Sequence, residues 1–305
     1  MSLNVLITGS NGQLGNKLKD LIFGPGPVNN RYFFTDIADL DYNGYSKLDI
    51  TCREAVVNFV EVHNINVIIN CAAYTNVERA EDDFDTANLL NNIAVGNLSY
   101  ACAKVGAALI HLSTDYVFNG KGSTPYRVDE TPDPIGVYGK TKYSGELAVM
   151  GSSCKYIIIR TAWLYSEYGN NFVKTMIKLT STRPQIRVVD DQTGTPTYAG
   201  DLADLIFRIV EKGAIEGNEG VYHFTDEGVC TWYDFALQIA KLAGTAAPEG
   251  ECVISPCTSE EFPSKVTRPT YSVLDKSLIK RRFAYVIPQW EESLRVCMKN
   301  LLPAK

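Results

Sequence analysis

The first half of the chain alternates short apolar runs with longer stretches in which apolar residues recur at helical spacing. The short runs predict strands, and the longer stretches predict amphipathic helices. The predicted strands are residues 5–8, 31–35, 67–70, 107–113 and 156–160, and the predicted helices are residues 13–22, 53–63, 86–105 and 138–149. Strands that alternate with helices build a parallel sheet with helices on its faces. The pattern therefore predicts an α/β fold, a Rossmann-type doubly wound parallel sheet.

The second half follows without an internal repeat, a low-complexity tract or an obvious linker. Composition therefore marks no lobe boundary, and we infer one from function, near Arg160. Residues 1–160 are then the first lobe, and residues 161–305 are mainly a smaller α/β lobe. Some later segments, at about 185–212, are expected to return to the first lobe. Within the second lobe, residues 232–242 predict an amphipathic helix that Thr231 caps.

Composition narrows the class of protein. The chain has 305 residues, and 29 Lys and Arg against 35 Asp and Glu give a net charge of -6 without a basic run, which disfavours a nucleic-acid partner. The first residues lack the pattern of a signal peptide, and no apolar run is long enough to span a bilayer. We expect a cytoplasmic protein without a membrane partner. The eight cysteines include no Cys-x-x-Cys pair, so reduced thiols are expected in place of a zinc site or a disulfide framework.

A glycine-rich loop joins the first predicted strand to the first predicted helix. This is where dinucleotide-binding folds hold a pyrophosphate against backbone N–H groups and the positive end of a helix. Gly9 permits the tight turn, Gly12 lets the backbone approach phosphate, and Gly15 lets the helix and strand pack closely. The candidate cofactor-binding residues here are Gly9, Ser10, Asn11, Gly12, Gln13 and Leu14.

Asp36 lies at the end of the next predicted strand, about 20 residues further on, where a carboxylate binds the adenosine ribose. Its charge resists the 2′-phosphate of NADP unless a cation compensates, so local chemistry slightly favours NADH. Further candidates follow the ends of predicted strands and could line the adenine and ribose, although small residues at strand ends often serve packing alone. They are Asp49, Ile50, Ala72, Ala73, Tyr74 and Thr75.

Three polar residues, Ser113, Thr114 and Asp115, follow the apolar run of residues 107–112. They are therefore expected at the carboxyl edge of the sheet, where doubly wound folds bind ligands. A hydroxyl at this edge can hydrogen-bond a substrate carbonyl and stabilise the charge that grows during hydride attack. Such a run is also typical of a turn or a helix cap.

Tyr138 and Lys142 lie four residues apart and so share one face of a predicted helix. An ammonium beside a phenol stabilises the phenolate and lowers the pKa of the tyrosine. Such a pair suits protonation of a carbonyl oxygen during hydride transfer. The same spacing also occurs on solvated helix surfaces. The catalytic interpretation of the pair therefore depends on the presence of the glycine loop and Thr114 in the same chain.

Taken together, these segments resemble the short-chain dehydrogenase/reductase superfamily in its extended, nucleotide-sugar-modifying branch, and within it the dTDP-4-dehydrorhamnose reductases. The matching segments are residues 70–81, 113–118, 138–142, 160–165 and 191–197, and Arg268 and residues 272–275 extend the similarity towards the C-terminus. The most specific are Ser-Thr-Asp-Tyr-Val-Phe at 113–118, Gly-Asn-Asn-Phe at 169–172 and Gln-Thr-Gly-Thr-Pro-Thr at 192–197.

The resemblance implies NAD(P)H-dependent reduction of the 4-keto group of dTDP-4-dehydro-6-deoxy-L-mannose to dTDP-L-rhamnose, the last step of dTDP-rhamnose biosynthesis. Residues 1–160 then form the NAD(P)-binding domain and the second lobe binds the dTDP-sugar. By this resemblance Tyr138 donates the proton, Lys142 lowers the pKa of Tyr138 and bonds the nicotinamide ribose, and Thr114 hydrogen-bonds the reacting oxygen. Asp115 is expected close to the sugar, and Trp163 matches a position that contacts substrate.

For several other polar residues, a structural role explains the sequence as well as a role in binding or catalysis does. Asn92 matches an asparagine of the superfamily that supports the active site, but a solvent-facing asparagine in a helix explains it as well. In the second lobe, amides, hydroxyls and a guanidinium could hold sugar hydroxyls and a diphosphate, or could serve as caps, turns and surface ion pairs. These residues are Asn170, Asn171, Gln192, Thr193 and Arg268.

Several alternatives stay open. The chain could be another nucleotide-sugar 4-ketoreductase, an epimerase or a dehydratase. A dehydratase needs acid and base residues next to the catalytic hydroxyl, and here Asp115 supplies an acid but no Glu directly follows it. It could also be a non-catalytic, cofactor-binding regulatory subunit like that of methionine adenosyltransferase, although such a subunit has no chemical need for Thr114, Tyr138 and Lys142 together. The sequence does not decide between a monomer and a homodimer. A structural Mg²⁺ near the acidic pair Glu291 and Glu292 is also left open, and no metal ligands are assigned.

Overall fold

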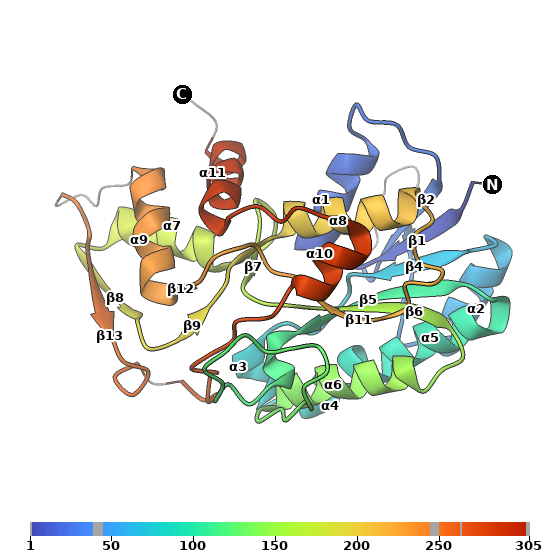
Figure 1. Cartoon of the computed structure of the whole chain (residues 1–305), viewed down its shortest axis with the longest axis horizontal. Coiled ribbons are helices and arrows are strands. Elements are labelled where there is room, and N and C mark those ends of the chain that lie inside the picture. The colour runs from blue at the N-terminus through green and yellow to red at the C-terminus, as the bar shows by residue number, and fades with distance from the viewer. Residues whose placement is uncertain (1, 39–44, 245–249, 263, 303–305) are drawn as a thin grey trace.

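The computed structural model describes residues 2–38, 45–244, 250–262 and 264–302. Its centre is a seven-stranded sheet in which every paired strand is parallel (Figure 1). The strands are β1 (Asn4–Thr8), β2 (Arg31–Asp36), β3 (Tyr45–Lys47), β4 (Val67–Asn70), β5 (Ala108–Thr114), β6 (Lys155–Thr161) and β11 (Gly220–His223). Their order is β11-β6-β5-β4-β1-β2-β3, so the direction of winding reverses between β1 and β4. Doubly wound folds bind ligands at this switch point.

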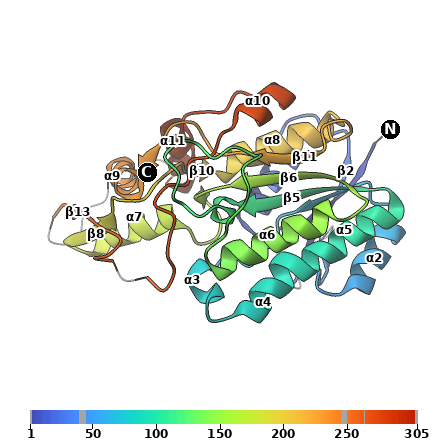
Figure 2. The ribbon, with the colours of Figure 1, turned by 60° about the horizontal axis from the view of Figure 1, so that its bottom comes forward.

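Helices cover both faces of the sheet (Figure 2). Val5 and Ile7 of β1 pack with α1 (Gln13–Ile22), α8 (Ala199–Glu211) and α10 (Ser277–Phe283). Leu6, which points to the opposite face, packs with α2 (Arg53–Val62), α5 (Ala94–Val105) and α6 (Val137–Met150). Strands buried on both faces need continuous apolar runs, and this is the pattern that the sequence shows. The predicted doubly wound α/β fold is confirmed.

The five predicted strands and four predicted helices are present, with ends that move by a residue or two. The predicted helix at 86–105 is composite: α4 (Phe84–Asn88) leads through a π-helical turn, η1 (Leu89–Ile93), into α5. Edge strand β3 was not predicted, because three residues are too few to show an alternating pattern.

The second lobe lies on the left of Figure 1. Three pairs of short strands support it: β8 with β13, β7 with β10, and β9 with β12. Their bounds are β7 (Leu164–Tyr165), β8 (Gln185–Val189), β9 (Thr193–Gly194), β10 (Thr197–Tyr198), β12 (Cys230–Thr231) and β13 (Val253–Cys257). The helices α7 (Phe172–Thr182), α9 (Trp232–Ala243) and α11 (Trp290–Leu301) share its apolar core. Thr231 and Asp234 form a capping box at the start of α9, which confirms the predicted capped helix.

The chain crosses between the lobes several times. Strand β8 stays in the second lobe, where it pairs with β13. Helix α8 returns to the sheet of the first lobe, and β11 and α10 follow it there. Of the expected return at about 185–212, therefore, the later part lies against the sheet and the earlier part does not. In the described residues, no helix has the length and apolar character to cross a membrane.

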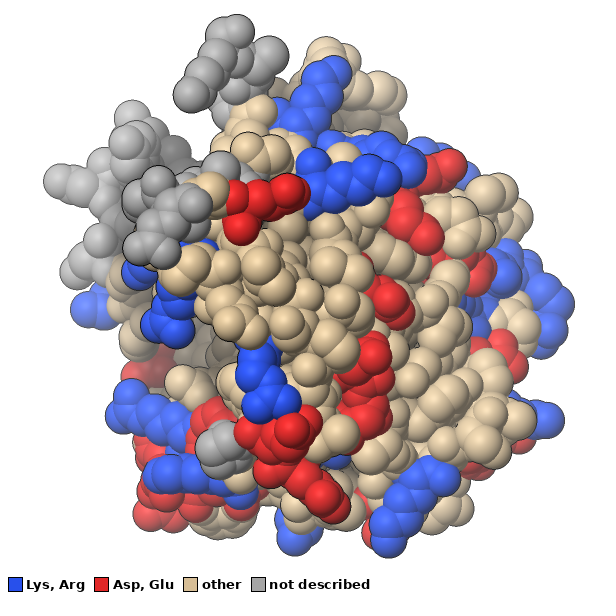
Figure 3. Space-filling view, turned by 90° about the vertical axis from the view of Figure 1, so that its left-hand side faces the viewer, with Lys and Arg blue, Asp and Glu red and all other residues tan. Residues whose placement is uncertain are grey.

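Charged side chains of both signs are interspersed on the face that the second lobe presents in Figure 3. Lys and Arg do not gather into a single patch on this face, and several lie directly beside Asp or Glu. In the second lobe, Arg187 forms an ion pair with Glu261 at 2.8 Å.

Candidate active site

The glycine loop lies at the switch point of the sheet, between β1 and α1. Gly9 has a φ of +62°, and a Cβ there would lie 2.6 Å from the backbone of Ala72, in the segment that follows β4. Only glycine fits so close an approach. A Cβ at Gly15 would lie 2.6 Å from the backbone of Ser10, so this glycine also allows the close packing that the sequence predicted. The two segments at the switch point thus form one contiguous surface.

This surface fits the pyrophosphate of a dinucleotide. Gly12 is the N-cap of α1, and a Cβ at this position would meet only the carbonyl oxygen of Gly9, at 3.3 Å. The buried hydroxyl of Ser10 has no hydrogen-bond partner in the described part of the chain. An open approach to a helix N-terminus, with an unsatisfied hydroxyl beside it, is the chemistry that binds phosphate.

Asp36 ends β2 beside the glycine loop, and its carboxylate accepts a hydrogen bond from the backbone N–H of Asn11 at 3.0 Å. Lys19 Nζ donates to the side-chain oxygen of Asn11 at 3.0 Å. Burial lowers the pKa of Lys19, and the carboxylates of Asp36 and Asp20 partly oppose this lowering. A cation therefore lies close to Asp36, which is the condition under which the sequence allowed NADP as well as NADH.

Two other predicted cofactor residues, Asp49 and Ile50, make contacts that stabilise the fold. Asp49 accepts hydrogen bonds from the backbone N–H and the hydroxyl of Thr51, at 2.9 and 2.7 Å, in the turn before α2. The side chain of Ile50 is buried in the core, and its carbonyl oxygen accepts from Asn97 at 3.1 Å. Their contact with a cofactor stays a prediction.

Asn91 holds the segment after β4 by hydrogen bonds to its backbone. This segment contains Ala72, Ala73, Tyr74 and Thr75. The buried Asn91 amide accepts from the Tyr74 N–H at 2.9 Å, donates to the Tyr74 carbonyl at 3.1 Å, and donates to the Thr141 hydroxyl at 3.3 Å. Thr141 belongs to α6, so one amide joins the cofactor side of the site to the helix that carries Tyr138 and Lys142.

Sequence reasoning matched Asn92 instead of Asn91. Asn92 is only partly buried and bonds Asn88 in its own helix, as its solvent-facing interpretation expected. The helical spacing of Ala87, Asn91 and Val95, all buried, was a usable signal for the correct residue. Asn91 also lies in the π-helical turn η1, and such turns are frequent at functional sites.

Thr114, Asp115 and Tyr138 meet at the carboxyl edge of the sheet. The Thr114 hydroxyl donates to Asp115 Oδ1 at 2.9 Å and also caps the short 3₁₀ turn η2 (Asp115–Val117). Burial raises the pKa of Asp115 to about 6, although the Thr114 hydrogen bond opposes it. Asp115 Oδ2 is buried without a hydrogen-bond partner within the described ranges, so it can still accept from a ligand hydroxyl.

Tyr138 lies in the first turn of α6 with its phenol beside Thr114. Burial raises the pKa of Tyr138 to about 12, and a hydrogen bond with Thr114 opposes the rise. Lys142, one turn later, donates from Nζ to the Leu112 carbonyl oxygen at 2.6 Å. The net pKa shift of Tyr138 is therefore upward, opposite to the lowering expected from Lys142, because burial outweighs the other effects and the ammonium is held by Leu112.

Lys142 itself is almost fully buried. Burial lowers its pKa to about 8, and the carboxylate of Glu146 opposes that lowering. Glu146 is also buried and is paired with Arg160 of β6 through hydrogen bonds of 2.7 and 2.9 Å. The sequence did not reveal this pair, because its two residues belong to different elements, α6 and β6, and no local pattern encodes how these pack.

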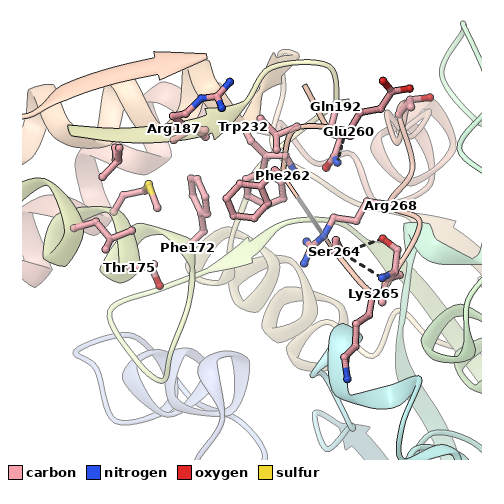
Figure 4. Close-up of a pocket in the computed structure, with 18 of the residues that line it drawn as sticks. Phe172, Thr175, Arg187, Gln192, Trp232, Glu260, Phe262, Ser264, Lys265 and Arg268 are labelled. Atoms are coloured by element: carbon pink, nitrogen blue, oxygen red, sulfur yellow. Dashed lines mark hydrogen bonds between the residues drawn. The ribbon is translucent and has the colours of Figure 1, made fainter. Parts of the chain in front are cut away.

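A cavity of about 1250 Å³ opens on the second lobe (Figure 4). Phe172, Trp232 and Phe262 point towards one another at one part of it. Four cationic side chains also line the cavity, namely Arg183, Arg187, Lys265 and Arg268. In Figure 4, Arg187 lies on one side of the aromatic group, and Arg268 and Lys265 lie on the other. An aromatic surface next to several cations is suited to a base attached to phosphates. Two residues considered from the sequence, Gln192 and Arg268, line this cavity, whereas Asn171 caps α7.

Trp163 stacks on Trp232, with ring centroids 3.6 Å apart and an interplanar angle of 11°. Its φ is +49°, and a Cβ at Gly194 would lie 2.7 Å from its ring. Since Trp232 lines the cavity, Trp163 packs directly against a residue of the cavity wall. The sequence indicated a core role for the aromatic residues of α9, and Trp232 shows that one of them also faces the cavity.

The cavity adjoins the catalytic candidates through Tyr116. The ring of Tyr116 packs edge-on against that of Tyr138, with centroids 5.5 Å apart. Burial raises the pKa of Tyr116, and the guanidinium of Arg268, which lines the cavity, opposes the rise. Arg268 therefore links the cavity wall to Tyr116 and, through the ring of Tyr116, to Tyr138.

Comparison with known proteins agrees with this geometry. The family model described as the RmlD substrate binding domain matches residues 3–302. The chain belongs to this family. The dTDP-4-dehydrorhamnose reductase of Aggregatibacter actinomycetemcomitans is 40% identical over 295 residues, which cover 95% of this chain and 97% of that relative. The resemblance inferred from the motifs is thereby confirmed.

Solved structures of family members share the whole architecture. A dTDP-4-dehydrorhamnose reductase from Clostridium acetobutylicum is 40% identical, with a TM-score of 0.87 and coverage of 98% of this chain and 99% of that one. A dTDP-4-dehydrorhamnose reductase from Bacillus anthracis, solved in complex with NADP, is 38% identical, with a TM-score of 0.86 and coverage of 98% and 100%.

Among the described residues, no group of three or more His, Cys, Asp or Glu side chains is placed to hold a metal ion. Glu291 and Glu292 lie in the first turn of α11. The structural Mg²⁺ considered from the sequence gains no support from this arrangement.

Proposed function

We propose that this protein reduces the 4-keto group of dTDP-4-dehydro-6-deoxy-L-mannose to give dTDP-L-rhamnose, with NADPH or NADH as reductant. The observation that carries the proposal is the meeting of Thr114, Asp115 and Tyr138 at the carboxyl edge of the sheet, next to a cavity with aromatic and cationic walls. The family membership and the names of its relatives support the same reaction.

The reaction needs a proton on the carbonyl oxygen and a hydride on the carbon. Tyr138 is protonated near neutral pH, because burial raises its pKa to about 12, and it can release its proton to an oxygen that gains negative charge. The Thr114 hydroxyl lies beside it and can hydrogen-bond the same oxygen. Lys142, one turn later on α6, would stabilise the phenolate left on Tyr138, as the resemblance implies.

The nicotinamide supplies the hydride when the cofactor is bound. Gly9, Gly12 and the N-terminus of α1 would hold its pyrophosphate, with the unsatisfied hydroxyl of Ser10 beside them. Asp36 would bond the adenosine ribose, and the nearby ammonium of Lys19 makes a 2′-phosphate acceptable. Both reduced cofactors are therefore proposed.

The second lobe would bind the nucleotide of the sugar. Phe172, Trp232 and Phe262 offer faces for a base, and the cations of the cavity offer charge for a diphosphate. The unpartnered Asp115 Oδ2 is suited to a sugar hydroxyl, and Trp163 would contact the substrate from the wall that it shares with Trp232.

The test is turnover with enzymatically prepared dTDP-4-dehydro-6-deoxy-L-mannose, followed by loss of the reduced-nicotinamide absorbance with NADH and with NADPH. Mass analysis should identify dTDP-rhamnose as the product. Binding of cofactor without turnover would reject the proposal and favour either another keto-sugar or the regulatory alternative. A cytoplasmic location and a monomeric or homodimeric state belong to the same proposal, and cell fractionation and light scattering test them.

A further inference from the structure

We propose that Glu78 is a positioning residue that couples the nucleotide cavity to the cofactor segment after β4, so that a nucleoside diphosphate in the cavity tightens the binding of NADPH. This inference rests on the proposed function, because it takes the cavity as the nucleotide site and the glycine-loop surface as the cofactor site. The inference adds that the nucleotide site and the cofactor site influence each other through the carboxylate of Glu78.

Glu78 lies in the short helix α3 (Val77–Ala80), directly after the segment that holds Ala72 and Tyr74. Residues 264–272, which we call the strap, form part of the cavity wall and reach this helix. The carboxylate of Glu78 accepts from the Ser264 hydroxyl at 2.6 Å, the Lys265 N–H at 3.1 Å and Arg268 Nη2 at 2.9 Å. Three donors of the strap thus meet on a single side chain.

The charge state of this carboxylate suits the role. Burial raises the pKa of Glu78, but the hydrogen bonds from Ser264 and Arg268 outweigh that effect and hold the pKa below its usual value. Glu78 therefore stays charged near neutral pH. Figure 4 shows Arg268 beside Ser264 at the cavity, with Lys265 extended towards the α3 side.

The far end of the strap is fixed to the catalytic edge. The Thr270 hydroxyl and the Tyr271 N–H both donate to the Gly120 carbonyl, at 2.8 and 3.1 Å. A Cβ at Gly120, whose φ is +74°, would lie 2.4 Å from Pro269. The backbone next to Arg268 is therefore anchored, and the guanidinium of Arg268 is the group of the strap that both contacts Glu78 and lines the cavity.

The segment on the other side of Glu78 is equally well connected. Asn76 caps α3 through the Arg79 N–H, and the backbone of Tyr74 is held by Asn91. Ala72 touches Gly9 in the glycine loop. Any ordering of α3 is therefore passed to the surface that we assign to the cofactor.

Arg268 and Glu78 are about one-third exposed, at 35% and 39% of their side-chain surface. An ion pair with this exposure contributes little stability by itself. A diphosphate bound to Arg268 would hold the guanidinium in place, and Arg268 has enough donors to keep its bond to Glu78. The conformational entropy of the Arg268 and Glu78 side chains is then lost only once when both ligands bind. Each ligand therefore favours the binding of the other.

The experiment measures the affinity of the full chain for NADPH by calorimetry, with and without saturating dTDP. For the wild type we expect dTDP to tighten NADPH binding by at least about 5-fold, and NADPH must tighten dTDP binding by the same factor. Glu78→Gln and Glu78→Ala should bind each ligand alone with nearly wild-type affinity and should bring the coupling factor close to one.

Asp82→Asn is the matched control. It removes the exposed ion pair of the same strap, between Lys265 and Asp82 at 2.6 Å, and leaves Glu78 in place, so the coupling should persist. Absence of coupling in a wild type that binds both ligands would overturn the inference, as would full coupling in Glu78→Ala. If neither ligand binds the wild type, the proposed function fails first and the inference fails with it.

Discussion

Tyr138 keeps its proton across the neutral range, because burial raises its pKa to about 12. The sequence suggested a phenol made acidic by Lys142, whereas the structure gives a protonated donor beside Thr114 and a buried ammonium held by Leu112. For reduction of a carbonyl this is a workable starting state, since the donor must carry a proton when the oxygen becomes basic.

Replacement of Tyr138 by Phe removes the proton donor and leaves the glycine loop untouched. Turnover should fall by about 10²- to 10⁴-fold, the usual contribution of a positioned acid. The affinity for NADPH, measured by fluorescence titration, should stay close to that of the wild type. A Phe variant that retains most of the activity would show that another group protonates the oxygen.

Lys142 should set an upper pH limit for activity. Its pKa is lowered to about 8 in the ligand-free protein, so raising the pH through this value removes its positive charge. We expect kcat/KM to fall above pH about 8 with unit slope, because kcat/KM reports the ionisation of the free enzyme. Lys142→Arg should be less active but should lose this limb, since arginine does not titrate there. An unchanged limb in Lys142→Arg would assign it to a different group.

The catalytic candidates were predictable because their chemistry lies in short segments, at the glycine loop, at residues 113–115 and at Tyr138 with Lys142. Asn91 was missed by one position, since two adjacent asparagines can be told apart only by the helical phase. Trp232 was missed as a cavity residue because its stacking on Trp163 depends on a contact between distant elements.

Among the secondary-structure elements, α6 carries Tyr138 and Lys142 and is fastened to the sheet by the buried ion pair of Glu146 and Arg160. Arg160 Nη1 also lies 3.5 Å from His223 Nε2, and burial lowers the pKa of His223 to about 3, so this histidine is neutral. A fully buried charge pair leaves a costly unpaired charge when one partner is removed.

Glu146→Gln should therefore reduce the free energy of unfolding by about 3–5 kcal/mol, as measured by urea denaturation. Glu216→Gln is the control, because it breaks the exposed ion pair with Lys155 at the start of β6 and should change stability little. Equal effects of the two substitutions would contradict the role assigned to the buried pair.

At this scale the sequence predicted the strands and helices of the first lobe well, because each apolar run is long enough to show its period. It did not predict the edge strand β3 or the π-helical turn η1. The first has only three residues, and the second differs from an α-helix by a hydrogen-bond shift that leaves no apolar signature.

In the whole molecule, the chain passes between the two lobes several times. The wall of the cavity therefore includes segments that are far apart in the sequence. Helix α8 and strand β11 return to the large sheet, whereas the strap joins the second lobe to α3 in the first. Contacts such as Ser264 with Glu78 link residues that are 186 positions apart. No local pattern encodes such pairs, so the sequence predicted a substrate lobe without predicting its cavity.

The most direct test of the account follows the hydrogen atoms. The wild type is supplied with NADPH that carries two deuterium atoms at C4 of the nicotinamide and with dTDP-4-dehydro-6-deoxy-L-mannose, and the product is analysed by mass spectrometry and NMR. The account predicts dTDP-rhamnose with one deuterium on sugar carbon 4, and loss of this product in Tyr138→Phe. Oxidation of the cofactor without deuterium at carbon 4, or undiminished deuterium transfer in Tyr138→Phe, would contradict it.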